Sequence, residues 1–436
     1  MTRMKESGID WIGQIPEEWE VIKVKFFTYM KGRIGWQGLK ADEFIDEGPY
    51  LVTGTDFKNG RVNWDTAYHI SQKRYEQAPE IQLKQGDLLV TKDGTVGKLA
   101  LIDELPESAS LNSHLLVLRP LFNRYDNHFL YYVLSSLEFK NYFQKVSIGS
   151  TMDSLSQEKM GEFIFSLPNI NVQNSISRYL DKKTAQLDKV KALLEEQIQK
   201  LKDYRASLIY ETVTKGLDKT VPMKDSGIDW IGQVPEGWGV GKVKYFSQIS
   251  AGATPDRNNS LFWNGNINWM SSGEVNQGIV KHTSETITDL ALKRTSTKLL
   301  PNGTVMLALN GQGKTKGTAA VLAIESASNQ SLASFIVDNQ ILNNMYLYYF
   351  FVANYYNIRG LKGEDRDGLN LQLVSNIDIP LFEIEEQQKI VDFLNKKTVQ
   401  IDQLIQIKNQ QIKNINKQRQ TLIYDYVTGK KRGKEI

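Results

Sequence analysis

The sequence predicts an α/β (α+β) fold: two mixed α/β lobes separated by a pair of long antiparallel helices, with cyclic pseudo-two-fold symmetry. Two repeats and the composition between them support this. A helical stretch of about 40 residues occurs twice, a 24-residue segment occurs twice, and short β-rich runs fill the intervals. The predicted domains are residues 1–167, 168–217, 218–379 and 380–428, followed by a basic tail at 429–436.

The two long helices are predicted from an apolar residue at every seventh position. The first copy has Leu180, Leu187, Leu194, Leu201 and Leu208, and 214 residues later stand Leu394, Ile401, Lys408, Ile415 and Leu422. Neither run contains Pro or Gly, and a seven-residue apolar period is typical of helices that pack lengthwise on a partner. Each helix would span roughly 60 Å. We expect each to be the partner of the other; the alternative is two core helices of separate domains.

The shorter repeat precedes each lobe. Met4–Phe27 and Met223–Phe246 are identical at 18 of 24 positions, at an offset of 219. Gly8, Gly13 and Pro16 predict a turn-rich segment. Trp11 and Trp19 are expected to be buried anchors, because an indole offers no acid–base chemistry.

Each lobe is predicted to combine short strands with one helix, because β-rich runs are bounded by Gly, Asp or Pro. In the first lobe the strands are Tyr50–Thr53, Ile81–Leu83, Asp87–Thr91, Leu99–Ile102 and Leu115–Leu118, with a core-facing helix at His128–Gln144. In the second lobe the strands are Ile267–Met270, Val305–Leu309 and Ala319–Leu322, with a helix near Asn344–Tyr356.

The two halves of the chain are related cyclically. The first helix ends in YETVTKGL and is followed by MKDSGIDW, while the second ends in YDYVTGKK and the chain begins with MKESGIDW. If the helices are antiparallel, a pseudo-two-fold axis relates the lobes and the N- and C-termini lie close together.

Composition limits the class of protein. The 436 residues contain no cysteine, which excludes disulfides and thiolate metal sites and fits a reducing cytoplasm. The N-terminal MTRMKESGIDW has no apolar run, so it does not predict a signal peptide, and no apolar stretch is long enough to span a membrane. We expect a cytoplasmic protein without membrane contact.

The net charge of +3 is distributed unevenly. Residues 168–217 hold nine basic and six acidic side chains, and residues 380–436 hold eleven and seven, a combined excess of seven positive charges. The remainder of the chain is therefore net negative by four. A protein that binds nucleic acid usually has a clear positive excess, so this chain would bind DNA through local basic patches or with help from partners.

The sequence lacks a complete catalytic motif. Gly311–Thr315 resembles a phosphate loop, but Ala308 stands where that motif requires glycine. The four histidines do not lie at metal-ligand spacing, and neither a G-x-S-x-G elbow nor an adenine-methylation motif occurs. We therefore expect no metal and no catalytic residues on this chain, and a binding or scaffolding role.

Two kinds of loop residue are candidates for DNA contact. Arg and Asn suit bidentate reading of base edges, and lysines suit phosphate contacts. The alternative for any single residue is a solvated loop position. The candidates are Arg33, Trp36, Lys92 and Lys98 in the first lobe, and Thr254, Arg257, Asn258, Asn259, Lys314 and Lys316 in the second.

Three features together resemble the specificity subunit of type I restriction–modification systems. They are the repeated GIDWIGQ(I/V)PE-x-W, the run GATP…FWNGNINW at Gly252–Trp269, and paired helices that end in LIY-x-x-V-T. The resemblance covers essentially the whole chain. The first lobe departs from it, with GRIGWQG in place of GATP.

The resemblance implies a host-defence role in DNA methylation and restriction. Each lobe would be a target-recognition domain that reads one half of a bipartite, asymmetric site in double-stranded DNA. The helices would set the spacer and dock two methyltransferase (M) subunits, with motor-endonuclease (R) subunits completing the complex. This chain would be non-catalytic and without cofactors, and S-adenosylmethionine, ATP and Mg²⁺ would belong to the partners.

The main alternative is a structural adapter whose lobes bind protein rather than DNA. Divergent lobes joined by near-identical connectors favour DNA recognition, because two lobes that differ can read two half-sites while the shared parts fit two copies of one partner. An unrecognised enzyme is a third possibility.

Overall fold

The computed structural model describes residues 3–9, 11–33, 39, 41–147, 154–311, 313–361 and 368–431. The chain divides into two compact units. Unit 1 consists of residues Met1–Leu194 and Asn409–Ile436, and unit 2 of Glu195–Lys408. Each unit holds one lobe and half of each long helix, so the units cut across the predicted domain boundaries.

The first lobe is built on one six-stranded sheet with the order β4-β12-β9-β10-β7-β6. Its strands are β4 (Thr28–Lys31), β12 (Leu115–Pro120), β9 (Leu88–Thr91), β10 (Leu99–Leu101), β7 (Arg61–Val62) and β6 (Phe57–Lys58). A second sheet joins β11 (Ala109–Leu111), β5 (Phe44–Val52) and β8 (Tyr68–Ile70). Two small antiparallel pairs join β1 (Met4–Glu6) to β2 (Gln14–Pro16), and β3 (Glu20–Lys23) to β13 (Ile164–Leu167).

The second lobe repeats this plan. Its main sheet has the order β17-β24-β21-β22-β19, from Ser247–Ala251, Leu332–Val337, Val305–Ala308, Ala319–Leu322 and Ile279–Val280. Its second sheet joins β20 (Glu285–Ile287), β18 (Trp263–Met270) and β23 (Ala327–Ser328). The small pairs are β14 (Met223–Asp225) with β15 (Gln233–Pro235), and β16 (Gly239–Lys242) with β25 (Asp378–Leu381).

Short helices complete each lobe. Lobe 1 has α1 (Val24–Phe27), α2 (Gln72–Glu76), α3 (Asn127–Ser135), α4 (Leu137–Ser147), α5 (Gln157–Glu162), η2 (Ala41–Glu43), η3 (Trp64–Thr66) and η4 (Pro79–Ile81). Lobe 2 has α7 (Asp289–Arg294), α8 (Asn344–Ala353), α9 (Tyr355–Gly360), α10 (Leu371–Ser375), η5 (Val243–Tyr245), η6 (Ser260–Phe262) and η7 (Ser272–Gln277).

Three predictions about the elements were wrong. The helix predicted near Asn344–Tyr356 ends at Ala353, and α9 begins at Tyr355 after the interruption at Asn354. The predicted helix His128–Gln144 is interrupted at Ser136, which has extended backbone angles and donates its hydroxyl to the Val133 carbonyl. The predicted strand Ile81–Leu83 is instead the end of η4 followed by an isolated bridge between Gln82 and Ser110.

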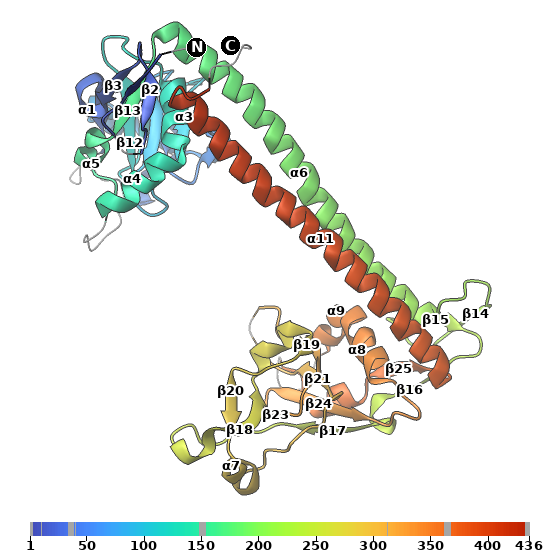
Figure 1. Cartoon of the computed structure of the whole chain (residues 1–436). Coiled ribbons are helices and arrows are strands. Elements are labelled where there is room, and N and C mark those ends of the chain that lie inside the picture. Colours follow the sequence, from blue (N-terminus) through green and yellow to red (C-terminus); the bar gives the residue numbers. More distant parts are fainter. Residues whose placement is uncertain are drawn as a thin grey trace. The chain divides into compact units, whose positions relative to one another are not determined.

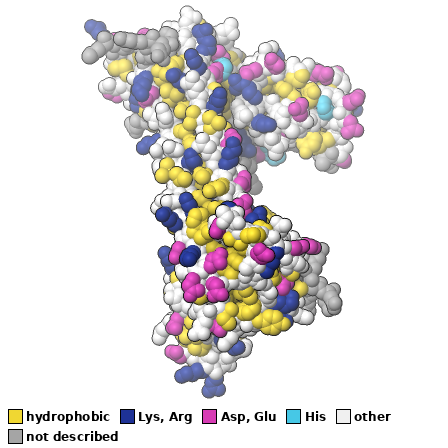
Figure 2. Space-filling view, turned by 90° about the vertical axis from the view of Figure 1, so that its right-hand side faces the viewer, with side chains coloured by type: hydrophobic (Ala, Val, Ile, Leu, Met, Phe, Trp, Pro, Cys, Tyr) yellow, Lys and Arg dark blue, Asp and Glu magenta, His cyan; other side chains and the backbone are white. Residues whose placement is uncertain are grey.

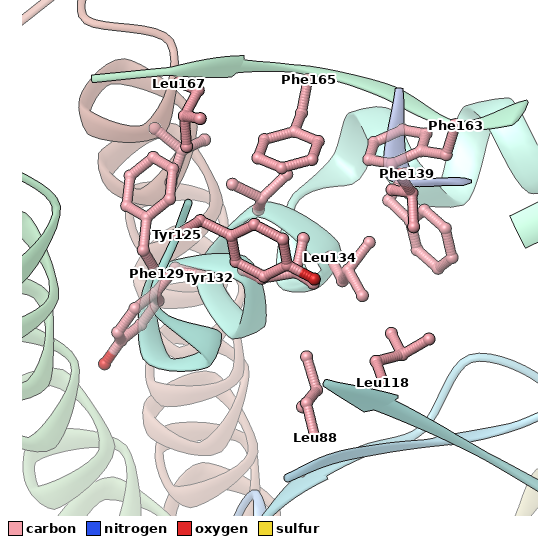
Figure 3. Close-up of a cluster of buried hydrophobic side chains, with 14 of the residues drawn as sticks. Leu88, Leu118, Tyr125, Phe129, Tyr132, Leu134, Phe139, Phe163, Phe165 and Leu167 are labelled. Atoms are coloured by element: carbon pink, nitrogen blue, oxygen red, sulfur yellow. The ribbon is translucent and has the colours of Figure 1, made fainter. Parts of the chain in front are cut away.

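The core of lobe 1 lies between its main sheet and α3. Leu88 and Leu118 project from the sheet towards α3 (Figure 3). Phe163 and Phe165 lie on the other side of α3, away from the sheet (Figure 3). These side chains are almost completely buried, so the large apolar area that they remove from water stabilises the lobe. Lobe 2 has an equivalent cluster around Phe335 and Phe350.

The two long helices are α6 (Ile170–Lys215) and α11 (Ile384–Val427), which lie side by side in Figure 1. Their pairing is antiparallel within each unit, as the sequence predicted. In unit 1 the rings of Tyr179 and Tyr426 lie 4.6 Å apart, and Arg419 Nε is 3.7 Å from Asp188 Oδ1. In unit 2, Lys408 Nζ donates to Gln197 Oε1 at 2.6 Å, and Arg205 Nε is 3.5 Å from Asp402 Oδ1.

The predicted seven-residue seam follows the protected side of both helices. Leu180, Leu394 and Ile401 are buried. The remaining predicted positions are half-buried: Leu187, Leu194, Leu201, Leu208, Ile415 and Leu422. By contrast, Val190 and Leu404 are 47% and 46% exposed, so these two residues lie outside the seam.

The cyclic relation between the halves is visible in the packing of each unit. In unit 2, Tyr210 at the end of α6 donates its hydroxyl to the Trp230 carbonyl in the repeated segment. In unit 1, Tyr424 at the end of α11 makes the same contact with the Trp11 carbonyl, although the two residues are 413 positions apart. The N-terminal segment and the end of α11 therefore pack against each other in unit 1.

Candidate nucleic-acid interface

The predicted DNA-contact loops of each lobe meet at one end of its main sheet. In lobe 1, the register pairs Lys31 at the end of β4 with Val117, and Thr91 at the end of β9 with Leu115. The turns that follow β4 and β9, and the turn that precedes β12, therefore lie together. In lobe 2, Ala251 and Ala308 pair with Ala333 and Leu332 at the start of β24. We call this end of each sheet the strand-end surface.

Lys92 and Lys98 flank the β9–β10 turn of lobe 1. Thr91 fixes the turn, because its hydroxyl donates to the Thr95 carbonyl at 2.6 Å and accepts from the Lys98 amide at 2.9 Å. Lys98 is exposed and Lys92 is half-buried. The Lys92 ammonium lies over Gly32, so the structure brings this predicted residue to the loop after β4.

Arg33 does not belong to the accessible part of this surface. Its side chain is buried: Nε donates to the Leu111 carbonyl at 3.0 Å, and a terminal nitrogen donates to Ser110 Oγ at 3.0 Å. Burial lowers the pKa of Arg33 to about 10, so it remains charged at neutral pH. A guanidinium enclosed in this way cannot reach a base edge, so the prediction that Arg33 contacts DNA was wrong. The other candidate of this loop, Trp36, lies outside the described residues.

A hydrogen-bonded loop after β17 carries four candidates of lobe 2. The Trp269 indole donates to the Ala253 carbonyl at 3.0 Å, and the Trp263 indole donates to the Asp256 carbonyl at 3.0 Å. Thr254 donates its hydroxyl to Gln330. The Gly252 amide donates to the Leu332 carbonyl of β24 at 3.3 Å, so the loop is fixed to both sheets of the lobe and its side chains are held in defined positions.

The side chain of Arg257 is held on this loop by two aromatic rings and a carboxylate. Its guanidinium lies 4.2 Å from the ring centre of Trp263 and 5.0 Å from that of Trp269, and it pairs with both carboxylate oxygens of Glu285. The hydrogen bond to Glu285 raises the pKa of Arg257. About half of the side chain remains exposed, so a DNA base would have to compete with Glu285.

The remaining candidates of lobe 2 differ in accessibility. Asn258 is exposed, whereas the side-chain oxygen of Asn259 accepts from the Leu261 amide at 3.1 Å and caps η6. Lys314 is exposed on the β21–β22 turn, and its carbonyl accepts from the Tyr355 hydroxyl at 2.9 Å. Lys316 is half-buried. The strand-end surface of lobe 2 therefore presents Arg257, Asn258 and Lys314 most openly.

Sequence reasoning missed the residues that orient these candidates. In lobe 1, His114 Nδ1 lies 2.5 Å from Asp93 Oδ1 and links the two turns of the strand-end surface. In lobe 2, Glu285 and Gln330 come from segments 28 and 76 residues beyond their partners. Such distant pairings leave no local signal in the sequence.

The surface charge is mixed. Lys and Arg side chains are interspersed with Asp and Glu on the face shown in Figure 2, in agreement with the small net charge. Within the described residues, no group of three His, Cys, Asp or Glu side chains is arranged to hold a metal ion, and none of the helices has the length and apolarity needed to cross a membrane.

Comparison with known proteins decides the family. The type I restriction modification DNA specificity domain matches residues 16–202 and 235–417, once for each half of the chain. The chain belongs to this family. It is a DNA-specificity subunit of the type I restriction–modification kind, as its sequence features predicted.

Relatives match this specificity subunit over nearly its whole length or over about half of it. It is 26% identical to the type I restriction enzyme MjaVIII specificity subunit of Methanocaldococcus jannaschii, over 97% of this chain and 95% of the relative. It is also 26% identical to the EcoR124I/EcoR124II specificity subunit of Escherichia coli, over 52% of each chain.

Two solved structures share the fold. One, from work on complex assembly and conformational transition of the type I R-M system, has a TM-score of 0.74 at 14% identity, over 95% of this chain and 98% of that one. The HsdS subunit of Thermoanaerobacter tengcongensis has a TM-score of 0.54, also at 14% identity, over 95% and 98% of the two chains.

Proposed function

We propose that each lobe reads one half of a bipartite, asymmetric site in double-stranded DNA through its strand-end surface. One observation carries the proposal: the main sheets of the two lobes are equivalent, and at the equivalent end of each sheet the two lobes place different side chains. Lobe 1 offers lysines on the β9–β10 turn, while lobe 2 adds Arg257 and Asn258 on a fixed loop. Phosphate contacts by lysine would position each lobe, and Arg and Asn would specify bases.

We further propose that α6 and α11 set the spacer between the half-sites and dock two methyltransferase subunits. Both helices expose an apolar pair at equivalent positions, Val190 with Leu193 and Leu404 with Ile407, at an offset of 214. Equivalent surfaces on both helices suit two copies of one partner. S-adenosylmethionine, ATP and Mg²⁺ would be bound by methyltransferase and motor-endonuclease subunits, and we assign no cofactor to this chain.

Methylome sequencing tests DNA recognition. A host that expresses this chain with its methyltransferase subunit should carry methylated adenines in one bipartite motif. Replacing Arg257 and Asn258 of lobe 2 with alanine should relax one half of that motif and leave the other half unchanged. Relaxation of both halves, or no motif in the wild-type host, would contradict the proposal.

The spacer role has a separate test. Inserting seven residues at equivalent positions of both helices preserves the seven-residue seam, whereas the simpler insertion of four residues would rotate it. Seven residues lengthen each helix by about 10 Å, which corresponds to roughly three base pairs of duplex. The methylated motif should gain about that many unread positions, and an unchanged spacer would exclude the helices as the determinant of length.

A further inference from the structure

The carboxylate of Glu285 lies among the proposed DNA-contact residues of lobe 2, although the sequence did not point to it. Glu285 is the first residue of β20, and the strand register pairs it with Trp269 near the end of β18. The same Trp269 fixes the loop that carries Arg257, through its hydrogen bond to the Ala253 carbonyl. Glu285 therefore adjoins the strand-end surface of lobe 2, and its side chain is 35% exposed.

Both members of the Arg257–Glu285 pair keep unused hydrogen-bonding capacity. Arg257 donates one N–H from each terminal nitrogen to the two carboxylate oxygens, so three of the five N–H groups of its guanidinium are left. Each carboxylate oxygen can accept a second hydrogen bond, and within the described residues the Glu285 carboxylate accepts from Arg257 alone. The pair thus offers donors and acceptors side by side to a molecule that approaches from solvent.

Two indole rings hold this pair in place. The rings of Trp263 and Trp269 meet edge to face, with their centres 5.1 Å apart, and the guanidinium of Arg257 lies against both. Trp269 is only 1% exposed, so it belongs to the core and gives the pair a rigid support. An exposed ion pair contributes little to stability, so the needs of the fold do not explain this arrangement. Polar groups that are already held in position lose little conformational entropy when they bind a ligand.

The pairing also makes a carboxylate compatible with DNA. A lone carboxylate would be repelled by the phosphates that border a groove, but Arg257 neutralises Glu285 and the pair carries no net charge. A paired carboxylate can therefore approach a base edge.

Lobe 1 has a different side chain at the corresponding place. β8 pairs with β5 as β20 pairs with β18, and the first residue of β8 is Tyr68, which the register pairs with Leu51. A phenol stands there in lobe 1 and a carboxylate in lobe 2. The two lobes thus differ in hydrogen-bonding chemistry at this position, as residues that read different half-sites must.

We propose that Glu285 determines specificity in lobe 2 by accepting a hydrogen bond from the N4 amino group of a cytosine in the major groove, while Arg257 donates to the guanine of the same base pair. A G·C pair presents the acceptors N7 and O6 on guanine and the donor N4 on cytosine, which match the unused donors and acceptors of the side-chain pair. Adenine fits less well, because its acceptor N7 adjoins its amino group and would face the carboxylate. This inference rests on the proposed function and names one base pair that lobe 2 reads.

Substitution of Glu285 gives the first test, by methylome sequencing of a host that expresses the full chain with its methyltransferase subunit. Glutamine suits N6 and N7 of adenine, so Glu285→Gln should change one cytosine of the lobe 2 half-site to adenine. Glu285→Ala should relax that position and leave the other half-site unchanged. Asp289→Asn makes the same chemical change at an exposed residue beyond the other end of β20, and should leave the motif as it is. An unaltered motif with a folded Glu285→Gln chain would overturn the inference.

Modified DNA tests the same contact with the wild-type protein, so this test does not depend on the folding of a variant. N4-methylcytosine, placed in turn at each cytosine of the lobe 2 half-site, should at one position weaken binding of the wild-type complex about tenfold or more, as measured by fluorescence anisotropy. The same modification should have no effect on the complex that contains Glu285→Ala.

The outcomes separate the two proposals. Undiminished binding of every modified duplex by the wild-type complex would overturn the inference, as would an equal loss of affinity with and without the Glu285 carboxylate. A lobe 2 half-site without any G·C pair would also overturn it. A wild-type complex that selects no bipartite motif would instead contradict the proposed function.

Discussion

Arg33 and Lys92 stand close together in lobe 1, yet the structure gives their charges different environments. Arg33 is enclosed and bonded to β11, whereas Lys92 is half-buried at the strand-end surface. Both were predicted as DNA contacts because both are basic loop residues. The partners of Arg33, Leu111 and Ser110, come from a strand almost 80 residues further along the chain, so no local pattern could have predicted its burial.

Substitution should separate these two residues. Arg33→Ala leaves the buried Leu111 carbonyl and Ser110 hydroxyl without charged donors, and should lower the free energy of unfolding by about 2–3 kcal/mol. Lys92→Ala should change it by less than about 0.5 kcal/mol. In the assembled complex, Lys92→Ala should reduce the salt dependence of DNA binding by about one unit of log–log slope. Denaturant titration and fluorescence anisotropy measure the two effects, and the reverse ranking in stability would contradict this assignment.

His128 makes a pH-dependent contact between lobe 1 and α6. Its Nε2 lies 3.3 Å from Asp181 Oδ2, and Tyr132 donates to Asp181 Oδ1 at 2.5 Å; Arg61 of β7 and Asp126 also face the ring. The hydrogen bond to Asp181 raises the pKa of His128. Burial alone would raise the pKa of Asp181, but hydrogen bonds from His128 and Tyr132 outweigh it and lower that pKa. Lobe 2 has the uncharged pair Met345 and Asn395 at the equivalent positions.

The double variant His128→Met/Asp181→Asn should therefore remove a pH dependence. The raised pKa of His128 gives stability that is present below its ordinary value of 6.5 and is lost as the pH rises through the raised pKa. The lowered pKa of Asp181 gives stability that is present above 3.8 and is lost as the pH falls.

The wild type should gain about 0.5–1 kcal/mol over the variant near pH 5.5, because the pair is partly solvated, and this gain should fade as the pH rises through the raised pKa of His128. Thermal unfolding across this range measures the difference. If the unfolding temperatures of the two proteins changed with pH in parallel, the His128–Asp181 contact would be excluded as a source of pH-dependent stability.

Among the elements, the long helices were the most predictable. A seam of one apolar residue in seven persists over four intervals, and no tertiary contact overrides so long a pattern. The helix at His128–Gln144 was harder to predict. Its apolar spacing continues through Ser136, but the helical backbone is interrupted there. Local hydrogen bonding by a serine side chain competes with the helix there, and apolar periodicity does not report it.

The seam predicts that alanine substitutions at buried and at exposed positions of the long helices lower the free energy of unfolding by different amounts. Leu180→Ala and Leu394→Ala remove side chains that are fully buried, and each should lower the free energy of unfolding by about 2.7–5 kcal/mol. Val190→Ala and Leu404→Ala remove exposed side chains outside the seam and should cost less than about 0.5 kcal/mol. Denaturant unfolding of the four variants tests the order, and equal losses at all four positions would contradict the seam.

At the scale of the whole molecule, unit 1 is assembled from the two ends of the chain, and unit 2 is continuous. Gly429 packs so closely on Pro16 that an added Cβ would lie 2.5 Å from Pro16 Cδ. In unit 2, Gly216 makes the corresponding approach to Trp238 and Pro235. This cyclic closure was predictable from the sequence, because the connector after the first helix repeats the start of the chain.

A circular permutant should therefore fold. Residue Gly429 would be joined to Met4 by the connector 217–222, and new ends would be opened between Gly216 and Met223. We expect an unfolding temperature within a few degrees of the wild type and an unchanged methylated motif, since both units keep their contacts. Opening the chain within β21, between Met306 and Leu307, should prevent folding, because these residues are buried in the central sheet. Loss of folding in the first permutant would contradict the closure.

The attachment of each lobe to its helix has a genetic consequence. Tyr132 contacts Asp181 and Thr184, and Tyr349 contacts Asn395 and Thr398 at the equivalent positions, so these tyrosine contacts are alike in both halves, although the charged His128–Asp181 contact occurs in lobe 1 alone among the two. A recombination event that exchanged one lobe between two chains with these residues would therefore keep the tyrosine contacts at its attachment. If each lobe reads one half-site as proposed above, such an exchange would change the DNA specificity in a single recombination event.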